Sequence, residues 1–408
     1  MKILHVIAQL PKRTGSGVYF KNIVEHMDKS HENAIIYGYE DHFDIEFEDK
    51  IKKYPVIFKS EEVPFPIVGM SDVMPYDSTK YSDLDDSMLK SWQDAFLRRI
   101  KWAKEEFKPD LVITHHCWML SSMVIENFEG TPVIVINHGT DIRQTKLNPD
   151  LHRKYVTNIG KASMVFALSS NDVDDIVKLF GVDRDKIVLM PGGFDSKIFY
   201  RNENIREKDG KIRIIYGGRI SHAKGVFELA KAFKILEQKY DNLKLNIVGD
   251  VDEATRKELE ELSGNSKNLK MHDACCQYNL SHKFRESDIF VLPSYYEGLG
   301  LVAMEALACG LLDVTTDIAG LKETLGDKIN ESGIIEYVPM PKLRTVDEPY
   351  EEELDPFVQR LAEGIEKQII KIKEGFNPGE DIYLELDSKS WKSILERIEK
   401  IALELVNK

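Results

Sequence analysis

The densest set of residues able to carry chemistry lies in one run, PSYYEGLGLVAMEA at 293–306. Glu297 and Glu305 are separated by seven residues in this run, and Gly298 and Gly300 lie between them. Carboxylates in such a loop and helix start can accept hydrogen bonds from sugar hydroxyls. A pair of solvated helix glutamates is the alternative. It fits less well because the surrounding run GLGLVAMEALACG is apolar, and an unpaired carboxylate is costly to bury.

A second group is cationic. Gly217-Gly218-Arg219 directly follows the apolar run 212–216, and Lys224 comes five residues after Arg219. Arginine can grip two phosphate oxygens at once, and lysine adds a compact charge. The pair beside glycines therefore suits a diphosphate, although surface charge with a helix cap is an alternative interpretation.

A glycine turn, Gly15-Ser16-Gly17, follows the first apolar run of the chain. Glycines there would let a ligand approach the backbone, and the start of the following helix favours an anion. The turn is neither a complete G-x-G-x-x-G nor a P-loop. A tight strand-to-helix turn without a ligand explains it equally well.

The run His115-His116-Cys117 ends another expected strand. Adjacent strand residues point to opposite faces, so we do not expect the three to converge on a metal ion. His116 is assigned instead to an acceptor pocket, with Asp141 and Arg143 as further contacts. The latter two fit a polar helix start equally well.

The scaffold follows from the alternation of short apolar runs with amphipathic stretches, which predicts parallel sheets covered on both faces by helices. The expected strands are 3–8, 34–37, 110–114, 132–136, 163–168 and 187–190, and then 212–216, 243–248, 288–292 and 311–316. The expected helices are 15–28, 92–107, 225–239, 300–309 and 388–406. The predicted fold class is α/β, with two doubly wound, Rossmann-like domains facing a cleft. Ligands of such sheets lie at the carboxyl ends of the strands.

Composition narrows the function classes. The formal net charge is −14, which argues against a general nucleic-acid binder because phosphate backbones need a basic surface. Four scattered cysteines without a C-x-x-C pair indicate a reduced, intracellular protein. The start MKILHVIAQL lacks the features of a signal peptide, and no apolar run is long enough to span a bilayer. We therefore expect a cytoplasmic protein, with peripheral attachment at the inner membrane face left open.

The runs IIYGGRISHAKG and LPSYYEGLGLVAMEALACG make the sequence resemble the retaining glycosyltransferases of family 4, which have the GT-B fold. The resemblance covers most of the chain and is densest between residues 212 and 325. It implies an acceptor-side domain at 1–195, a nucleotide-sugar domain at 196–380, and a C-terminal helix at 381–408 that crosses back onto the first domain.

The resemblance also implies roles for the second domain's residues. Arg219 and Lys224 would bind the donor diphosphate and steady the leaving group, beside Gly218. Glu297 would contact the transferred sugar, and Glu305 would hold the ribose. The loop residues that reach the donor through their backbone are Gly298, Gly300 and Leu301.

For the first domain, the resemblance places His138 close to the reacting sugar. It places Gly17 near the diphosphate, and Gly15 with Ser16 on the acceptor side. No cofactor and no metal are implied. The expected activity is retaining transfer of a sugar from a nucleotide-diphosphate sugar, UDP-linked as the first choice, to a hydroxyl of a glycan, lipid or small alcohol.

Two departures from the family pattern concern the identity of the donor's nucleotide. Leu311-Leu312-Asp313 replaces the usual Pro-Val pair, and HDACCQY at 272–278 replaces a frequent Gly-Tyr contact to the base. Two alternatives keep the fold, namely a nucleotide-sugar epimerase and a non-catalytic nucleotide-sugar-binding protein. A nicotinamide-dependent oxidoreductase is disfavoured because no full G-x-G-x-x-G follows the first strand.

Overall fold

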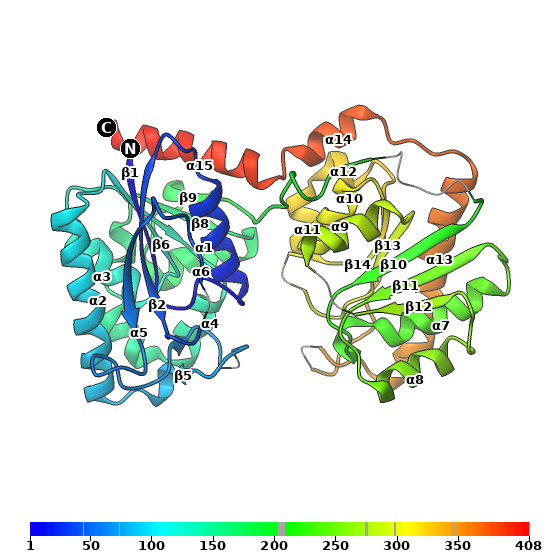
Figure 1. The fold of residues 1–408 in the computed structure, drawn as a ribbon, viewed down its shortest axis with the longest axis horizontal. Helices are drawn as coiled ribbons and strands as arrows, with labels where there is room; N and C mark the ends of the chain where they lie inside the picture. The colour runs from blue at the N-terminus through cyan, green and yellow to red at the C-terminus, as the bar shows by residue number, and fades with distance from the viewer. Residues whose placement is uncertain are drawn as a thin grey trace. The chain divides into compact units, whose positions relative to one another are not determined.

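A computed structural model describes residues 1–43, 45–72, 74–202, 209–273, 276–297, 299–345 and 347–407. The chain divides into two compact units (Figure 1), which are Met1–Gly192 with Ile394–Lys408, and Gly193–Ser393. We call them the first and the second unit. Helix α15 (Trp391–Val406) begins in the second unit and continues in the first, where Glu399 Oε1 accepts a hydrogen bond from the backbone N–H of Asp28 at 2.7 Å.

The first unit is built on a seven-stranded parallel sheet in the order β3-β2-β1-β6-β7-β8-β9. Its strands are β1 (Lys2–Ile7), β2 (Glu32–Tyr39), β3 (Lys52–Ile57), β6 (Leu111–His115), β7 (Val133–Ile136), β8 (Met164–Ala167) and β9 (Ile187–Leu189). Its main helices are α1 (Gly15–His26), α2 (Asp86–Glu106), α3 (Met119–Asn127), α4 (Thr140–Leu147), α5 (Pro149–Tyr155) and α6 (Val173–Phe180). A short parallel pair, β4 (Val68–Gly69) and β5 (Thr79–Lys80), lies outside the main sheet.

The second unit is built on a six-stranded parallel sheet in the order β12-β11-β10-β13-β14-β15. Its strands are β10 (Ile212–Gly217), β11 (Leu243–Val248), β12 (Leu269–His272), β13 (Ile289–Leu292), β14 (Leu312–Thr316) and β15 (Ile335–Val338). Its helices are α7 (Val226–Glu237), α8 (Glu253–Leu262), α9 (Gln277–Arg285), α10 (Leu301–Ala308), α11 (Ala319–Leu325), α12 (Asp327–Asn330), α13 (Leu354–Lys373) and α14 (Glu380–Asp387).

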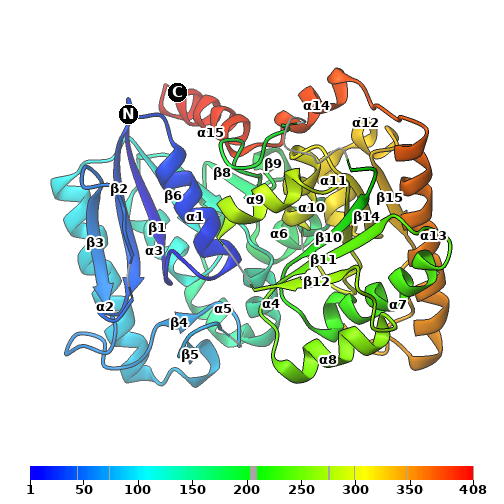
Figure 2. The ribbon, with the colours of Figure 1, turned by 45° about the vertical axis from the view of Figure 1, so that its right-hand side comes forward.

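Helices cover both faces of the second sheet (Figure 2), and each face has its own apolar core. Ile214 of β10 packs with residues of α7, α8 and α13, whereas its neighbour Ile215 packs with residues of α9, α10, α11 and α12. Successive strand side chains point to opposite faces, and burial on both sides explains why these strands are apolar throughout. The predicted doubly wound α/β architecture is confirmed.

The strand order places a topological switch point in each sheet. In the second unit, β10 and β13 are neighbours, and the chain moves from β10 toward one sheet edge and from β13 toward the other. In the first unit, β1 and β6 are placed in the same way. Doubly wound sheets bind ligands outside the carboxyl ends of such strands. The predicted site residues lie in the segments that follow β1, β6, β7, β10 and β13.

A buried carboxyl group in β14 gives a pH-dependent prediction. Asp313 is fully buried, and neither of its side-chain oxygens has a hydrogen-bond partner among the described residues. Burial raises the pKa of this carboxyl group well above its ordinary value, so the folded chain keeps a proton that the unfolded chain releases above about pH 4. Stability attributable to this proton is full below that pH. It then falls by about 1.4 kcal/mol per pH unit until the folded-state pKa is reached.

We therefore expect Asp313→Asn, which keeps the shape without the ionisation, to gain thermal stability over the wild type as pH rises from 5 to 7. Melting temperatures across this range measure the gain. Asp317→Asn is the matched control because Asp317 is half-exposed and pairs with Lys322 at 2.7 Å. A gain of the same size in the control would contradict the assignment to Asp313.

Candidate active site

A glycine turn at the end of β10 exposes Arg219. Gly218 has a positive φ of 153°, and a Cβ atom there would lie 3.2 Å from the Tyr216 hydroxyl. That hydroxyl donates a hydrogen bond to the Arg219 carbonyl oxygen at 2.6 Å, which fixes the turn. The Arg219 side chain is exposed and has no hydrogen bond or ion pair among the described residues. It is therefore available to an anion.

Lys224 and Glu297 form an ion pair that joins the segments after β10 and β13. Lys224 Nζ lies 2.6 Å from Glu297 Oε1. The same carboxylate oxygen accepts a hydrogen bond from Ser294 Oγ at 3.1 Å, and Lys224 Nζ also donates to the Tyr296 carbonyl oxygen at 3.3 Å. Both side chains are partly buried. A cation and a carboxylate are thus held in place together at the switch point of the second sheet.

Close backbone packing holds these two segments in register. Gly225 has a left-handed φ of 64°, and a Cβ atom there would lie 2.1 Å from the carbonyl oxygen of Pro293. The Tyr295 N–H donates to the Ala223 carbonyl oxygen at 2.9 Å beside this contact. The glycine of the sequence run A-K-G is therefore required by the approach of the loop after β13.

Helix α10 begins after Gly300, whose φ of 62° is left-handed, and Leu301 is its first residue. Glu305 on this helix is half-buried, and burial raises the pKa of its carboxyl group to about 8. Among the described residues it makes no hydrogen bond to Arg219 or Glu297. Gly298, predicted to contact the donor, lies outside the described residues.

The glycine turn of the first unit forms the N-terminus of α1. Thr14 Oγ1 accepts the Gly17 N–H at 3.0 Å. The buried Gln9 side chain donates to Thr14 Oγ1 at 2.9 Å and to Ser16 Oγ at 2.7 Å. A Cβ atom on Gly17 would lie 2.6 Å from the Leu10 carbonyl oxygen, whereas one on Gly15 would meet nothing within 4 Å. Gly17 is therefore needed by the turn itself, and Gly15 borders open space.

Three histidines gather at the carboxyl ends of β6 and β7. His115 Nδ1 lies 2.9 Å from His138 Nε2, and the His116 ring centroid lies 4.7 Å from that of His138. The expectation that His115 and His116 point to opposite faces is wrong. The strand ends at His115, and His116 has a left-handed φ of 72° that turns its ring toward His138. The described residues nevertheless contain no group of three or more histidines, cysteines or carboxylates arranged to hold a metal ion.

Asp141 anchors the backbone of this cluster. Its buried carboxylate accepts the Cys117 N–H at 2.6 Å and the His138 N–H at 3.2 Å. Burial raises the pKa of the Asp141 carboxyl group to about 6. This residue, predicted to contact an acceptor, has both carboxylate oxygens occupied by backbone groups.

The histidines are neutral at pH 7. Burial lowers the pKa of His138 to about 3. Burial, followed by the charge of neighbouring histidines, lowers the pKa of His115 and His116 well below the ordinary value. His138 can therefore donate or accept a hydrogen bond, but it does not supply a positive charge.

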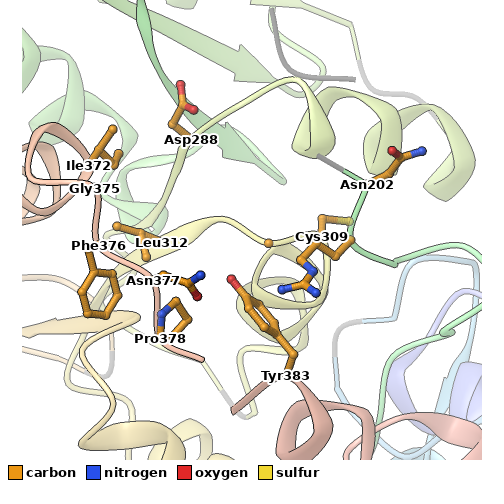
Figure 3. A pocket seen from close by; sticks show the side chains of 12 residues that line it. Asn202, Asp288, Cys309, Leu312, Ile372, Gly375, Phe376, Asn377, Pro378 and Tyr383 are labelled. Atoms are coloured by element: carbon orange, nitrogen blue, oxygen red, sulfur yellow. The ribbon is translucent and has the colours of Figure 1, made fainter. Parts of the chain in front are cut away.

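A cavity of about 340 Å³ elsewhere in the second unit is not the candidate site (Figure 3). Asp288 and Leu312, which line it, lie at the amino ends of β13 and β14. Arg201 at its wall already pairs with Glu380 at 2.7 Å and lies over the Tyr383 ring. The cavity is thus at the opposite end of the strands from Arg219 and Lys224.

Three residues that contribute to these sites were not among the predicted site residues, namely His115, Ser294 and Gln9. A polar residue at the carboxyl end of a switch-point strand is the signal that would have indicated His115 and Gln9.

Within the described parts of the chain, every helix is too short or too polar to cross a membrane.

Two protein families match this sequence over consecutive stretches of the chain. The family "Glycosyltransferase Family 4" matches residues 13–197, and the family "Glycosyl transferases group 1" matches residues 199–342. The first range covers most of the first unit and ends just inside the second, the other range lies within the second unit, and together they include all the predicted site residues.

Curated relatives match about half of the chain. The D-inositol 3-phosphate glycosyltransferase of Pseudarthrobacter chlorophenolicus is 27% identical over 238 residues, which are 52% of this chain and 56% of the relative. The putative teichuronic acid biosynthesis glycosyltransferase TuaC of Bacillus subtilis is 27% identical over 246 residues, which are 57% of this chain and 59% of the relative. The chain spans less than two thirds of the length of these relatives.

Solved structures match over nearly the whole chain. A glycosyltransferase from Rickettsia africae has a TM-score of 0.67 at 16% identity and covers 99% of this chain and 98% of its own. HepE of Anabaena in complex with UDP-glucose has a TM-score of 0.61 at 17% identity, with 99% and 100% covered. At this identity the likeness shows the fold. The two family matches show that the chain belongs to the family 4 glycosyltransferases, and the solved structures show that it has the GT-B fold.

Proposed function

We propose that this chain is a retaining glycosyltransferase that moves a sugar from a nucleotide-diphosphate sugar, UDP-linked as the first choice, to a hydroxyl of an acceptor. The observation that carries the proposal is the ion pair of Lys224 with Glu297, 2.6 Å apart, together with the exposed Arg219 in the same segment after β10. Two cations suit a diphosphate, and a carboxylate suits sugar hydroxyls. HepE of Anabaena has been solved with UDP-glucose, which makes UDP the first nucleotide to test.

In this proposal, the bond between the anomeric carbon and the diphosphate oxygen breaks, and its electron pair goes to the leaving diphosphate. Arg219 and Lys224 stabilise the charge that builds on that oxygen. Glu297 holds a hydroxyl of the sugar. The acceptor hydroxyl attacks from the same face and gives its proton to a leaving phosphate oxygen. His138, which is neutral, hydrogen-bonds the sugar.

The proposal predicts stabilisation by one class of nucleotide sugar. We expect the melting temperature to rise with UDP-, GDP-, ADP- or TDP-sugars, according to which nucleotide the chain accepts. A ligand at 100 times its dissociation constant adds about 2.7 kcal/mol to the stability of the folded state. The matching nucleoside monophosphate at the same concentration should stabilise less, because it lacks the second phosphate for Arg219 and Lys224. If all four donors left the melting temperature unchanged, the second unit would not be the donor site described here.

A further inference from the structure

The hydrogen bond between two histidines in the first unit restricts where their protons lie. His115 Nδ1 and His138 Nε2 are 2.9 Å apart. The two rings are nearly parallel, at 17°, with centroids 5.1 Å apart. This is the geometry of two imidazoles that meet edge to edge through their nitrogens. A neutral imidazole has one donor nitrogen and one acceptor nitrogen, so exactly one of the two facing nitrogens carries a proton.

The remaining nitrogen of His115 decides between the two arrangements. His115 Nε2 is buried and has no hydrogen-bond partner among the described residues. If His138 donated, His115 would carry its proton on this buried nitrogen, which would be an unpaired donor. If His115 donates from Nδ1, the same nitrogen is an unpaired acceptor. Buried orphan N–H groups are rarer than under-satisfied acceptors, so the second arrangement is favoured.

Aromatic rings pack against this pair. The rings of Tyr19 and Phe20 contact His115 edge-on, with centroids 6.1 Å and 5.1 Å away. The Tyr19 hydroxyl donates to the Met190 carbonyl oxygen at 3.0 Å. The His138 backbone is held by Asp141.

We propose that His115 is a positioning residue that keeps His138 in the tautomer with its proton on Nδ1. His138 then offers the bound sugar a hydrogen-bond donor and has no free basic nitrogen. The inference rests on the proposed function for the identity of the ligand, but the tautomer itself does not. It excludes His138 as the base that takes the acceptor's proton, and so agrees with transfer of that proton to the leaving phosphate.

Nuclear magnetic resonance of the full chain labelled with ¹⁵N-histidine tests the tautomer without any ligand. His138→Gln assigns the His138 signals by their loss. At pH 7 we expect His138 Nδ1 to resonate as a protonated nitrogen and Nε2 as an unprotonated one. The reverse pattern in the wild type would overturn the proposal. This readout stands even if the chain transfers no sugar, so the two failures are distinguishable.

A double-mutant cycle on nucleoside diphosphate release tests the positioning role. His115→Leu should lower kcat about 10- to 100-fold, by analogy with the loss seen when the outer hydrogen-bond partner of a metal-binding histidine is removed. His115→Asn, which retains an N–H donor near the position of Nδ1, should recover most of this loss. In a His138→Ala background His115→Leu should have little further effect, because both act through one contact. Additive losses, or a His115→Asn variant as poor as His115→Leu at equal melting temperature, would show that His115 is only structural.

Discussion

Arg219→Ala is expected to lower the rate of nucleoside diphosphate release about 10²- to 10³-fold, the effect of removing one preorganised group that stabilises charge in a transition state. The fold should be unaffected, because the Arg219 side chain is exposed and makes no hydrogen bond or ion pair to the described residues. Steady-state kinetics with the donor that stabilises the wild type give the ratio. Unchanged melting temperature without ligand should accompany the loss.

The matched control is Arg344→Ala. Arg344 is also exposed and in the second unit, and it pairs with Glu348 at 3.0 Å. Its loss should change the rate less than twofold at physiological salt. Equal rates for Arg219→Ala and the wild type would remove Arg219 from the donor site and leave the cationic turn without a function.

Gly225→Ala is expected to destabilise the second unit by about 4 kcal/mol or more, a size that requires a specific structural cause. The new Cβ would lie 2.1 Å from the Pro293 carbonyl oxygen, so the segments after β10 and β13 would have to separate. That separation would also break the Lys224–Glu297 pair. Scanning calorimetry should show a melting temperature lower by roughly 10 °C and no response to the donor.

Gly181→Ala is the matched control for Gly225→Ala. It measures the free-energy cost of placing alanine at left-handed dihedral angles without a steric contact like that with Pro293. Gly181 has φ 66° and ψ 29°, close to the φ 64° and ψ 17° of Gly225. Nothing lies within 4 Å of a Cβ atom placed on Gly181. This variant should lose only about 1–2 kcal/mol, the cost of a left-handed L-residue. Similar losses for both variants would contradict the close approach of the two segments.

Much of the fold could be predicted from the sequence, because the central strands are buried on both faces. The run expected at 243–248 is β11, and the run expected at 212–216 is β10 with one further residue. The edge strands β3, β12 and β15 were not predicted, since their sequences KKYPVI, LKMH and IEYV mix polar with apolar residues. Pro55 in β3 is tolerated because β3 is an edge strand.

Helix boundaries were less predictable than strands. Helix α2 begins at Asp86, six residues before the predicted start, because Asp85 caps it by accepting the Met88 N–H at 2.8 Å. Helix α15 begins at Trp391 and not at 388. Ser390 Oγ accepts the Ser393 N–H at 3.4 Å, so the serine at the helix start is Ser390 and not Ser388, the first residue of the predicted helix.

The candidate site was predictable where its residues lie within one motif. The run after β13 and the run after β10 each carry glycines and charges at fixed spacing, but the 2.6 Å contact of Lys224 with Glu297 depends on the strand order. The His115–His138 pair was not predictable. It requires both the neighbouring placement of β6 and β7 and the left-handed turn at His116, and neither has a local signature.

Whether the chain transfers sugar from a nucleotide sugar can be tested with the donor alone. Thermal stabilisation first identifies the nucleotide class, and proton nuclear magnetic resonance then follows that donor in the presence of the protein. We expect slow cleavage of the bond between the anomeric carbon and the diphosphate. The free sugar should first appear with the donor's anomeric configuration, and the rate should fall at least 100-fold in Arg219→Ala. An epimerised donor with no free sugar would contradict transfer and show that the chain is a nucleotide-sugar epimerase. A donor that stays unchanged, and that gives no product when acceptors are added, would show a binding protein without transfer activity.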